Sequence, residues 1–335
     1  MSHLQNRILK ASQLFCHGAL VLLSCLPAHA QFVPDKGITA SHWKEPVGGL
    51  EGYRWLSDKE VMYAHHSTPG YHFVKWDIAA KTEHELSGFS QLTRQSRDDS
   101  LDPPRVFPSP NGRYVAWIVG SRTLWVSSVD GSVIASHRGQ MGIAYPYWSE
   151  DSQSCFCFLT GNIPLQGPFY IAIAAINMNM PFAVKTHTIL DGGLMGDISV
   201  DHLRLANVHF KKTGQISVIA KRPFAEIKMG IEEYTLTESA KLVSTYALVK
   251  PDSDFLIINA VFSPTGDFIA WRFRNGDTAE IWISDGHGNN MLRLGKLLQK
   301  ETSLPYSGDP SELQWLPSGK GISFREAGEL WVVDR

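Results

Sequence analysis

One short phrase returns about every fifty residues along the chain and constrains its fold more than any other feature. The phrase joins an aromatic residue or proline to a Pro-x-Gly turn, and then to a run of β-branched and aromatic residues. The three clearest copies are Pro108–Trp117, Phe262–Trp271 and Trp315–Phe324. Self-similarity at a fixed period of this length is the signature of a repeat architecture.

Each copy predicts a strand, a tight turn, a second strand and, after a gap, a third strand. Proline presets φ for such a turn, and glycine accepts the positive φ that other residues resist. The flanking residues are β-branched and aromatic, as strands favour. Two copies follow their third strand with an Asp-Gly pair, Asp130-Gly131 and Asp285-Gly286, which is a hairpin signal. The repeating unit is therefore predicted to be a four-stranded antiparallel sheet.

Three weaker copies follow the same template, and the faintest of them, at Ile198, lacks both proline and glycine. The six copies begin at Trp55, Pro108, Trp148, Ile198, Phe262 and Trp315, separated by 53, 40, 50, 64 and 53 residues. Propellers are built from about four to eight four-stranded blades. We therefore predict an all-β, six-bladed β-propeller. A solenoid is the alternative, but it would need atypical polar caps at both ends, and the last copy reads as an interior one.

The last copy also predicts how the ring closes. The chain reaches Arg335 before a fourth strand of this copy can form, and a three-stranded blade would expose an unpaired edge. We expect the segment Gly37–Trp43 to supply the missing strand by pairing with the strand around Leu330. The first stretch of the mature chain would then close the ring against the last.

The first thirty residues have the pattern of a secretory signal. Arg7 and Lys10 give a positive start, an apolar run covers residues 15–26, and small residues stand at Ala28 and Ala30. These features fit cleavage near Ala30, and the apolar run is short for a membrane span. We expect a periplasmic or secreted protein.

These features divide the chain into a signal peptide (1–30), a closing segment (31–50) and the propeller (51–335). The alternative to cleavage near Ala30 is that the protein is a lipoprotein, with the lipid attached at Cys25. No later segment has the pattern of a transmembrane helix.

Composition excludes one class of partner. The chain has 31 basic and 33 acidic residues among 335, so nothing in its net charge favours nucleic acid. A local basic group of Lys211, Lys212, Lys221, Arg222 and Lys228 is followed closely by Glu226, Glu232 and Glu233. This charged stretch is interpreted as a solvated outer edge of the fourth blade. An exposed patch of this kind carries no site prediction.

Two cysteines remain after the signal, Cys155 and Cys157, two residues apart in a predicted strand. Their side chains should share one face of the sheet, where extended backbone keeps them from a good disulfide. We interpret them as two small buried apolar residues.

The Pro-x-Gly turn followed by Ile-Trp-x-x-Asp-x-x-Gly resembles the repeat of the TolB-like six-bladed propellers, a periplasmic WD-like class. The resemblance covers about residues 50–335 and is strongest in the second, fifth and sixth copies. It implies the fold and an envelope protein that interacts with other proteins. TolB has an additional N-terminal α/β domain, and the roughly 20 residues between the signal and the first copy leave no room for it here. The motif itself is a turn and a packing aromatic, and fold alone does not transfer function.

The enzyme motifs that would indicate catalysis are missing from the sequence. It has no Gly-x-Ser-x-Gly nucleophile elbow, and no His-Glu-x-x-His helix or Gly-x-x-x-x-Gly-Lys loop. We predict no cofactor, no metal and no catalytic residue. Asp98, Asp99 and Asp102 are interpreted as a polar crossing between the first two blades, with a cation site as the alternative. His65 and His66 should face opposite ways on one strand, with His72 opposite one of them.

Candidate binding residues come from the architecture. Innermost strands of a propeller surround an axial channel, and the residues three positions before the copies begin include four polar ones, Arg105, Tyr145, Asn259 and Glu312. They either line a water-filled channel or form a binding site at its mouth.

Long insertions are a second source of binding residues, because loops on a rigid scaffold carry function. Candidate insertions are Gly161–Pro168, Ile176–Phe182 and Phe224–Thr237. Met178, Met180 and Phe182 would either form an exposed apolar patch for a partner or pack back on the blade.

The sequence therefore predicts an exported, non-catalytic β-propeller that acts as a scaffold for an envelope or extracellular protein partner, with a small ligand at the channel as a further option. The alternative is a propeller enzyme, a lyase or hydrolase on a glycan or lactone, with a polar site at the channel mouth. A sugar- or peptide-binding accessory protein is a third hypothesis.

Overall fold

The computed structural model describes residues 32–46, 50, 52–67, 70–95, 105–119, 123–138, 142–160, 171–188, 208–211, 215–221, 229–236, 240–248, 254–276, 278–298, 313–326 and 328–335. Within these ranges the protein is almost entirely β, with one helix, α2 (Ser87–Gln95). The fourth repeat at Ile198 and the stretch Gly161–Pro168 lie outside the described residues. So do the Asp98–Asp102 crossing and the signal region.

The described strands form six antiparallel sheets, five with four strands and one with five. We number the sheets by their first long strand along the chain. The first sheet holds β3 (Arg54–Ser57), β4 (Glu60–Ser67), β5 (Gly70–Asp77) and β6 (Thr82–Glu85). The second holds β7 (Arg105–Pro108), β8 (Tyr114–Val119), β9 (Thr123–Ser128) and β10 (Val133–Arg138). The third holds β11 (Gly142–Trp148), β12 (Ser154–Thr160), β13 (Ile171–Asn177) and β14 (Met180–Thr188).

The remaining sheets follow the same chain order, with additions from the N-terminal segment. The fourth sheet holds β15 (Val208–Phe210), β16 (Gln215–Lys221), β17 (Met229–Leu236) and β18 (Ala240–Ala247). The fifth holds β19 (Leu256–Phe262), β20 (Phe268–Asn275), β21 (Thr278–Asp285), β22 (Leu292–Leu297) and β1 (Phe32–Pro34). The sixth holds β23 (Leu313–Trp315), β24 (Gly321–Glu326), β25 (Glu329–Asp334) and β2 (Ala40–Lys44).

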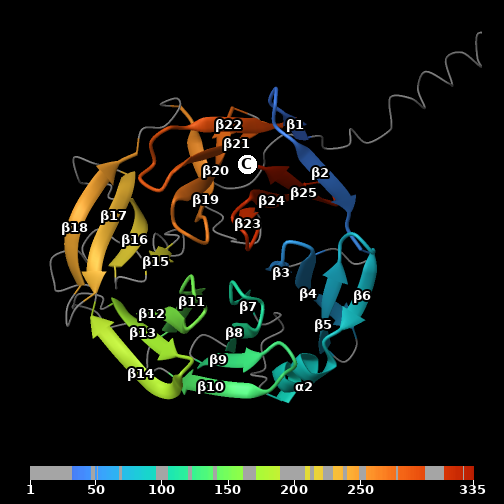
Figure 1. Ribbon diagram of the computed structural model, residues 1–335, viewed down its shortest axis with the longest axis vertical. Helices are drawn as coiled ribbons and strands as arrows, with labels where there is room; N and C mark the ends of the chain where they lie inside the picture. The colour runs from blue at the N-terminus through green and yellow to red at the C-terminus, as the bar shows by residue number, and fades with distance from the viewer. Residues whose placement is uncertain are drawn as a thin grey trace, which may run out of the picture.

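The sheets stand around a common centre, with the first strand of each nearest to it and the last at the periphery (Figure 1). This is the arrangement of a β-propeller, as the repeats predicted. Since each sheet is an antiparallel meander, the turns after its first and third strands lie at one end of the sheet. We call this end of the molecule the turn end.

The N-terminal segment pairs with two sheets. β2 runs antiparallel to β25, with Trp43 opposite Leu330, so the predicted pairing of residues 37–43 with this strand is confirmed for residues 40–43. β1 adds a fifth strand to the fifth sheet by pairing with β22, which the prediction of uniformly four-stranded sheets missed. Phe32 of β1 is buried and packs edge-on against Phe324 and Trp331 of the sixth sheet. A short strand of three residues ending in proline gives no signal in sequence.

Hydrogen bonds to a serine hydroxyl explain why the repeated turn has its form. In three copies a serine hydroxyl accepts the backbone N–H of the residue that begins the second strand. These pairs are Ser109 with Tyr114, Ser149 with Ser154, and Ser263 with Phe268, at 3.0, 2.9 and 3.1 Å. Each turn is thereby fixed by its own side chain as well as by its backbone.

The repeated tryptophan links one sheet to the sheet before it. Trp148 donates its indole N–H to the carbonyl of Phe107 at 2.8 Å, and Trp315 donates to the carbonyl of Val261 at 2.9 Å. Both acceptors lie one residue before the start of the preceding copy. Trp55 makes the corresponding bond to the hydroxyl of Ser323 in the sixth sheet, at 2.7 Å. The tryptophan that begins three of the copies is therefore a sheet-to-sheet connector.

Apolar side chains fill the space between neighbouring sheets. The fourth and fifth sheets share a core that includes Ile219, Ile231, Phe273 and Trp271. The second and third share one that includes Cys155 and Cys157. Both cysteines are free and buried, as predicted, and burial raises the pKa of the Cys155 thiol well above its ordinary value.

Two predicted insertions are wrong in part. Ile176–Phe182 is the hairpin between β13 and β14, with Asn177 opposite Met180. Met178, in the turn of this hairpin, packs against the core between the second and third sheets. Residues 229–236 of the predicted insertion Phe224–Thr237 form β17. Both stretches read as irregular because their turn residues lack the Pro-Gly pattern of the other copies.

Candidate functional site

Three of the four residues predicted from the axial channel lie on the strands nearest the centre (Figure 1). Arg105 begins β7 opposite Ile118, and Tyr145 lies where the pairing of β11 with β12 shifts register. Only the backbone of these two residues is described, and Glu312 lies outside the described residues. Their binding role stays a prediction.

Asn259 is the one of the four whose side-chain environment is described. It lies on β19 opposite Arg272 of β20, next to a register shift. Arg272 is buried and forms an ion pair with Glu326 of the sixth sheet at 3.4 Å. Arg272 therefore contributes to the contact between the fifth and sixth sheets.

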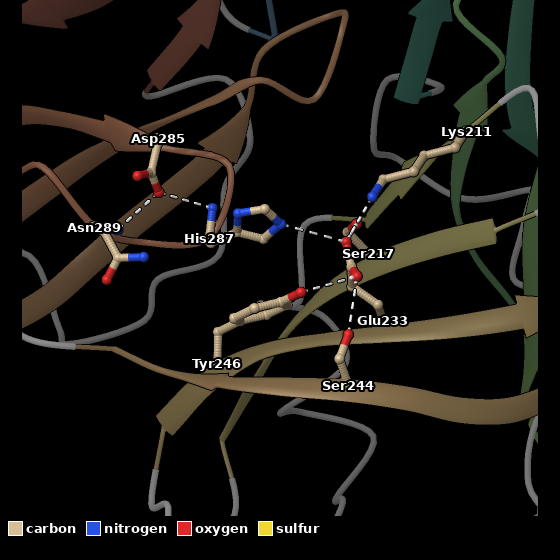
Figure 2. Close-up of polar contacts among 8 residues, drawn as sticks. All are labelled: Lys211, Ser217, Glu233, Ser244, Tyr246, Asp285, His287 and Asn289. Atoms are coloured by element: carbon tan, nitrogen blue, oxygen red, sulfur yellow. Dashed lines mark hydrogen bonds and ion pairs between the residues drawn. The ribbon is translucent and has the colours of Figure 1, made fainter.

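A second polar group, absent from the sequence predictions, lies between the fourth and fifth sheets (Figure 2). It consists of five side chains around the carboxylate of Glu233, and we call it the Glu233 cluster. Its members are Lys211, Ser217, Glu233, Ser244, Tyr246 and His287.

Strand register brings the first members of the cluster together. Glu233 of β17 lies opposite Ser217 of β16 on one side and Ser244 of β18 on the other. Because alternate residues of a strand share a face, Glu233 lies on the same face as Ile231, two residues earlier. Ile231 belongs to the apolar core with the fifth sheet, so this interface changes from apolar to polar within two residues of β17.

The carboxylate of Glu233 accepts hydrogen bonds from both neighbouring strands and from the β15–β16 turn. Lys211 donates to Oε1 at 2.5 Å, and Ser244 donates to Oε2 at 2.9 Å. Ser217 and Tyr246 add longer contacts of 3.5 Å. The side chain of Glu233 is only 14% exposed, whereas that of Lys211 is 33% exposed. The carboxylate is therefore enclosed while the ammonium group reaches solvent.

The fifth sheet supplies one member, His287 in the turn between β21 and β22. Its Nε2 lies 3.7 Å from Oε1 of Glu233, and its ring lies 4.3 Å from the ring of Tyr246, tilted by 36°. Asp285 accepts the backbone N–H groups of His287 and Asn289 through Oδ1, at 3.0 and 2.8 Å. The turn is thus built so that the imidazole faces the fourth sheet.

The electrostatics keep the carboxylate charged. Burial alone would raise the pKa of Glu233, but hydrogen bonds from Lys211 and Ser244 and the positive charges of Lys211 and His287 outweigh it. The pKa of Glu233 is therefore lowered from its ordinary value. A group held ionised and saturated with donors is poorly suited to take up a proton in catalysis, but well suited to fix charged neighbours.

Sequence reasoning placed Lys211 and Glu233 in a solvated outer edge, which is wrong for Glu233. The signal that could have found the cluster is the alternation of Ser217 and Glu233 with the buried Ile219 and Ile231. It was hidden because the fourth copy lacks the turn pattern that would align β15 to β18. His287 could not be assigned to the cluster without knowing which sheets are neighbours.

The strand register tests one of the histidine predictions. His65 lies opposite His72 across a hairpin, as predicted. Among the described residues, no three His, Cys, Asp or Glu side chains are placed to hold a metal ion. No helix within the described ranges is long and apolar enough to cross a membrane.

Comparisons with known proteins find structural neighbours of this chain but do not assign it to a family. No protein-family model and no curated sequence matches the chain. An oligogalacturonate lyase in complex with manganese is 10% identical over 92% of this chain and 98% of its own, with a TM-score of 0.49. TolB from Acinetobacter baumannii is 16% identical over 85% of this chain and 66% of its own, also with a TM-score of 0.49. A putative TolB from Agrobacterium tumefaciens is 14% identical over 89% and 98%, with a TM-score of 0.47.

TolB-like and oligogalacturonate lyase β-propellers are thus structural neighbours over most of the chain, as the repeat resemblance implied for TolB. Likeness at these identities and TM-scores carries no argument about ligand, partner or reaction.

Proposed function

We propose that the protein is an exported six-bladed β-propeller, closed by its N-terminal segment, that acts without catalysis as a binding scaffold in the cell envelope. Six sheets among the described residues and the pairing of β2 with β25 support the blade count and the closure. The signal pattern of residues 1–30 supports export. The partner is an envelope or extracellular protein.

The observation that carries the binding role is the fixed surface of the turn end. Besides the bonds within each turn, neighbouring turns are bonded to one another. The backbone N–H of Asn111 donates to the hydroxyl of Ser152 at 3.1 Å, and that of Ser318 donates to Asp58 Oδ1 at 3.0 Å. Loops that are fixed before binding lose little conformational entropy on association. A preorganised rim of loops on a rigid scaffold is where binding proteins place their contacts.

The Glu233 cluster belongs to this same end of the molecule. Lys211 follows β15 in the first turn of the fourth sheet, and His287 lies in the third turn of the fifth. A Cβ on Gly286 of that turn would meet the carbonyl of Gly266 in the neighbouring turn, so the turns of the fifth sheet lie in contact. The turn end therefore combines fixed loops with a charged group.

The experiment is capture of a partner by the purified full-length protein from an envelope extract. Charge reversal of three exposed turn residues, Arg113, Asp267 and Lys320, should abolish capture of any partner that wild type retains. The control carries the same number of reversals on outer strands, at Lys44, Glu83 and Glu85, and should retain capture. Equal capture by both variants would refute the turn end as the binding surface.

A further inference from the structure

The Glu233 cluster has more hydrogen-bond donors than its carboxylate can accept. A carboxylate offers about four lone-pair sites, and Lys211, Ser217, Ser244 and Tyr246 together supply four donors to it. His287 lies at 3.7 Å, beyond hydrogen-bond distance. The central acceptor is thus filled from within the fourth sheet alone.

The two remaining sources of N–H groups reach solvent. An ammonium group carries three N–H bonds, and one of those on Lys211 is directed at Glu233, while the side chain is 33% exposed. The imidazole of His287 is 46% exposed, and its ring is held against Tyr246. Both groups approach Oε1 of Glu233 from different sheets, Lys211 through Nζ at 2.5 Å and His287 through Nε2 at 3.7 Å (Figure 2).

The local charge favours an acceptor over a donor as the ligand. Glu233 and Lys211 cancel, and protonation of His287 leaves the cluster with one net positive charge. A ligand ammonium would have to displace Lys211, which already holds Oε1 at 2.5 Å. An oxyanion needs no such displacement, because Lys211 has two N–H groups that are not directed at Glu233 and Nε2 of His287 lies too far from Oε1 to be used in a hydrogen bond to it.

We propose that Lys211 and His287 form a site for a small oxyanion, a carboxylate or phosphate group, at the junction of the fourth and fifth sheets. The oxyanion bridges the two sheets through Lys211 Nζ and the imidazolium of His287. Charge-assisted hydrogen bonds of this kind are about twice as strong as neutral ones. The inference rests on the proposed binding role, since it names the chemistry that this end of the scaffold recognises. Its test uses purified protein and inorganic phosphate, so it can fail while partner capture succeeds, or the reverse.

The test is a titration of full-length protein with inorganic phosphate at pH 6 and constant ionic strength, followed by NMR of the histidine rings. The His287 resonance is assigned by its loss in His287→Asn. We expect a saturable shift of that resonance. Lys211→Met should weaken phosphate binding by about tenfold or more. The matched control is Lys75→Met, which removes the lysine of another Lys–Glu pair (2.7 Å, both side chains 31% exposed) that lies on a single sheet, and it should leave the titration unchanged.

The variant Glu233→Gln distinguishes most sharply between binding through Lys211 and His287 and binding through the carboxylate. It keeps the shape of the side chain and removes the negative charge beside the site, so phosphate should bind more tightly than to wild type. Loss of phosphate binding in this variant would overturn the proposal, because it would show that the binding depends on the carboxylate rather than on Lys211 and His287. No saturable shift of His287 in wild type would also overturn it, and that result does not depend on the folding of any variant.

A second arm identifies the source of the oxyanion. Vesicles of phosphatidylglycerol and of phosphatidylcholine are each sedimented with the protein. Binding to the first alone, lost in Lys211→Met, assigns the oxyanion to a lipid headgroup. Phosphate binding without sedimentation assigns it to a soluble molecule. Sedimentation that is unchanged in Lys211→Met, together with no phosphate shift, contradicts the site.

Discussion

Gly112 gives a direct test of how closely the sheets approach one another. It occupies the Pro-x-Gly turn of the second sheet with a φ of +67°. A Cβ built there would lie 2.5 Å from the backbone carbonyl oxygen of Leu56 in the first sheet. Backbone cannot rotate away as a side chain can, so Gly112→Ala should force the two sheets apart locally.

The expected loss of unfolding free energy in Gly112→Ala follows from a comparison with Gly276. That residue has a similar φ of +61°, and a Cβ there would meet no atom within 4 Å. Gly276→Ala should therefore cost only the left-handed conformation, about 1–2 kcal/mol. Gly112→Ala adds an overpacking cost of about 1–3 kcal/mol. The difference between the two variants isolates the contact between sheets from backbone strain.

The assay is denaturant unfolding of both variants, followed by tryptophan fluorescence. Gly266→Ala is an informative third member, since a Cβ there would meet the His209 side chain, which can move. We expect the loss of unfolding free energy to be largest for Gly112→Ala and smallest for Gly276→Ala. Values for these two that agree within about 0.5 kcal/mol would refute the close approach of the first and second sheets.

Three further predictions concern the connectors and the buried groups. Trp315→Phe should cost about 1–3 kcal/mol of unfolding free energy, because it leaves the carbonyl of Val261 without the indole donor; an unchanged denaturation midpoint would contradict the connector role. Phe32→Ala should cost about 3–5 kcal/mol, since its ring is buried between the fifth and sixth sheets, and calorimetry showing a loss near zero would place β1 outside the fold. Burial lowers the pKa of His209 below its ordinary value. Below about pH 6.5 His209 therefore binds a proton more readily in the unfolded chain than in the folded one. The free energy of unfolding should fall from pH 7 to 5, and it should fall less steeply in His209→Gln. Equal slopes for the two proteins would argue against this burial.

The local repeat made much of the fold predictable. Pro108, Phe262 and Trp315 begin copies whose strands appear where the pattern placed them, because turn chemistry and strand propensity are both local. The pairing of residues 37–43 with β25 was predictable for another reason: a three-stranded sheet at the chain end lacks a partner. β1 and α2 were missed, since neither a three-residue strand nor the polar segment Ser87–Gln95 carries a distinct period.

The Glu233 cluster was beyond prediction because its parts come together only through register and sheet order. Lys211 and Glu233 are 22 residues apart in a charged stretch, and His287 belongs to another repeat. Nothing in a single strand shows that Glu233 lies beside a buried isoleucine of the same face, facing the next sheet. Of the axial residues that the architecture suggested, Asn259 lies opposite the buried Arg272, and their binding role stays a prediction.

The central claim of the proposed fold is that the N-terminal segment completes the last sheet and so closes the propeller. The most direct measurement is disulfide formation in the double variant Ser41→Cys/Val332→Cys, because these residues are register partners of β2 and β25. Mapping of the oxidised full-length protein should find these two cysteines joined in nearly all molecules. In the control Ser41→Cys/Ser136→Cys, whose second cysteine lies on β10, no such link should form. Failure of the first pair to join under conditions in which the protein is folded would contradict the closure.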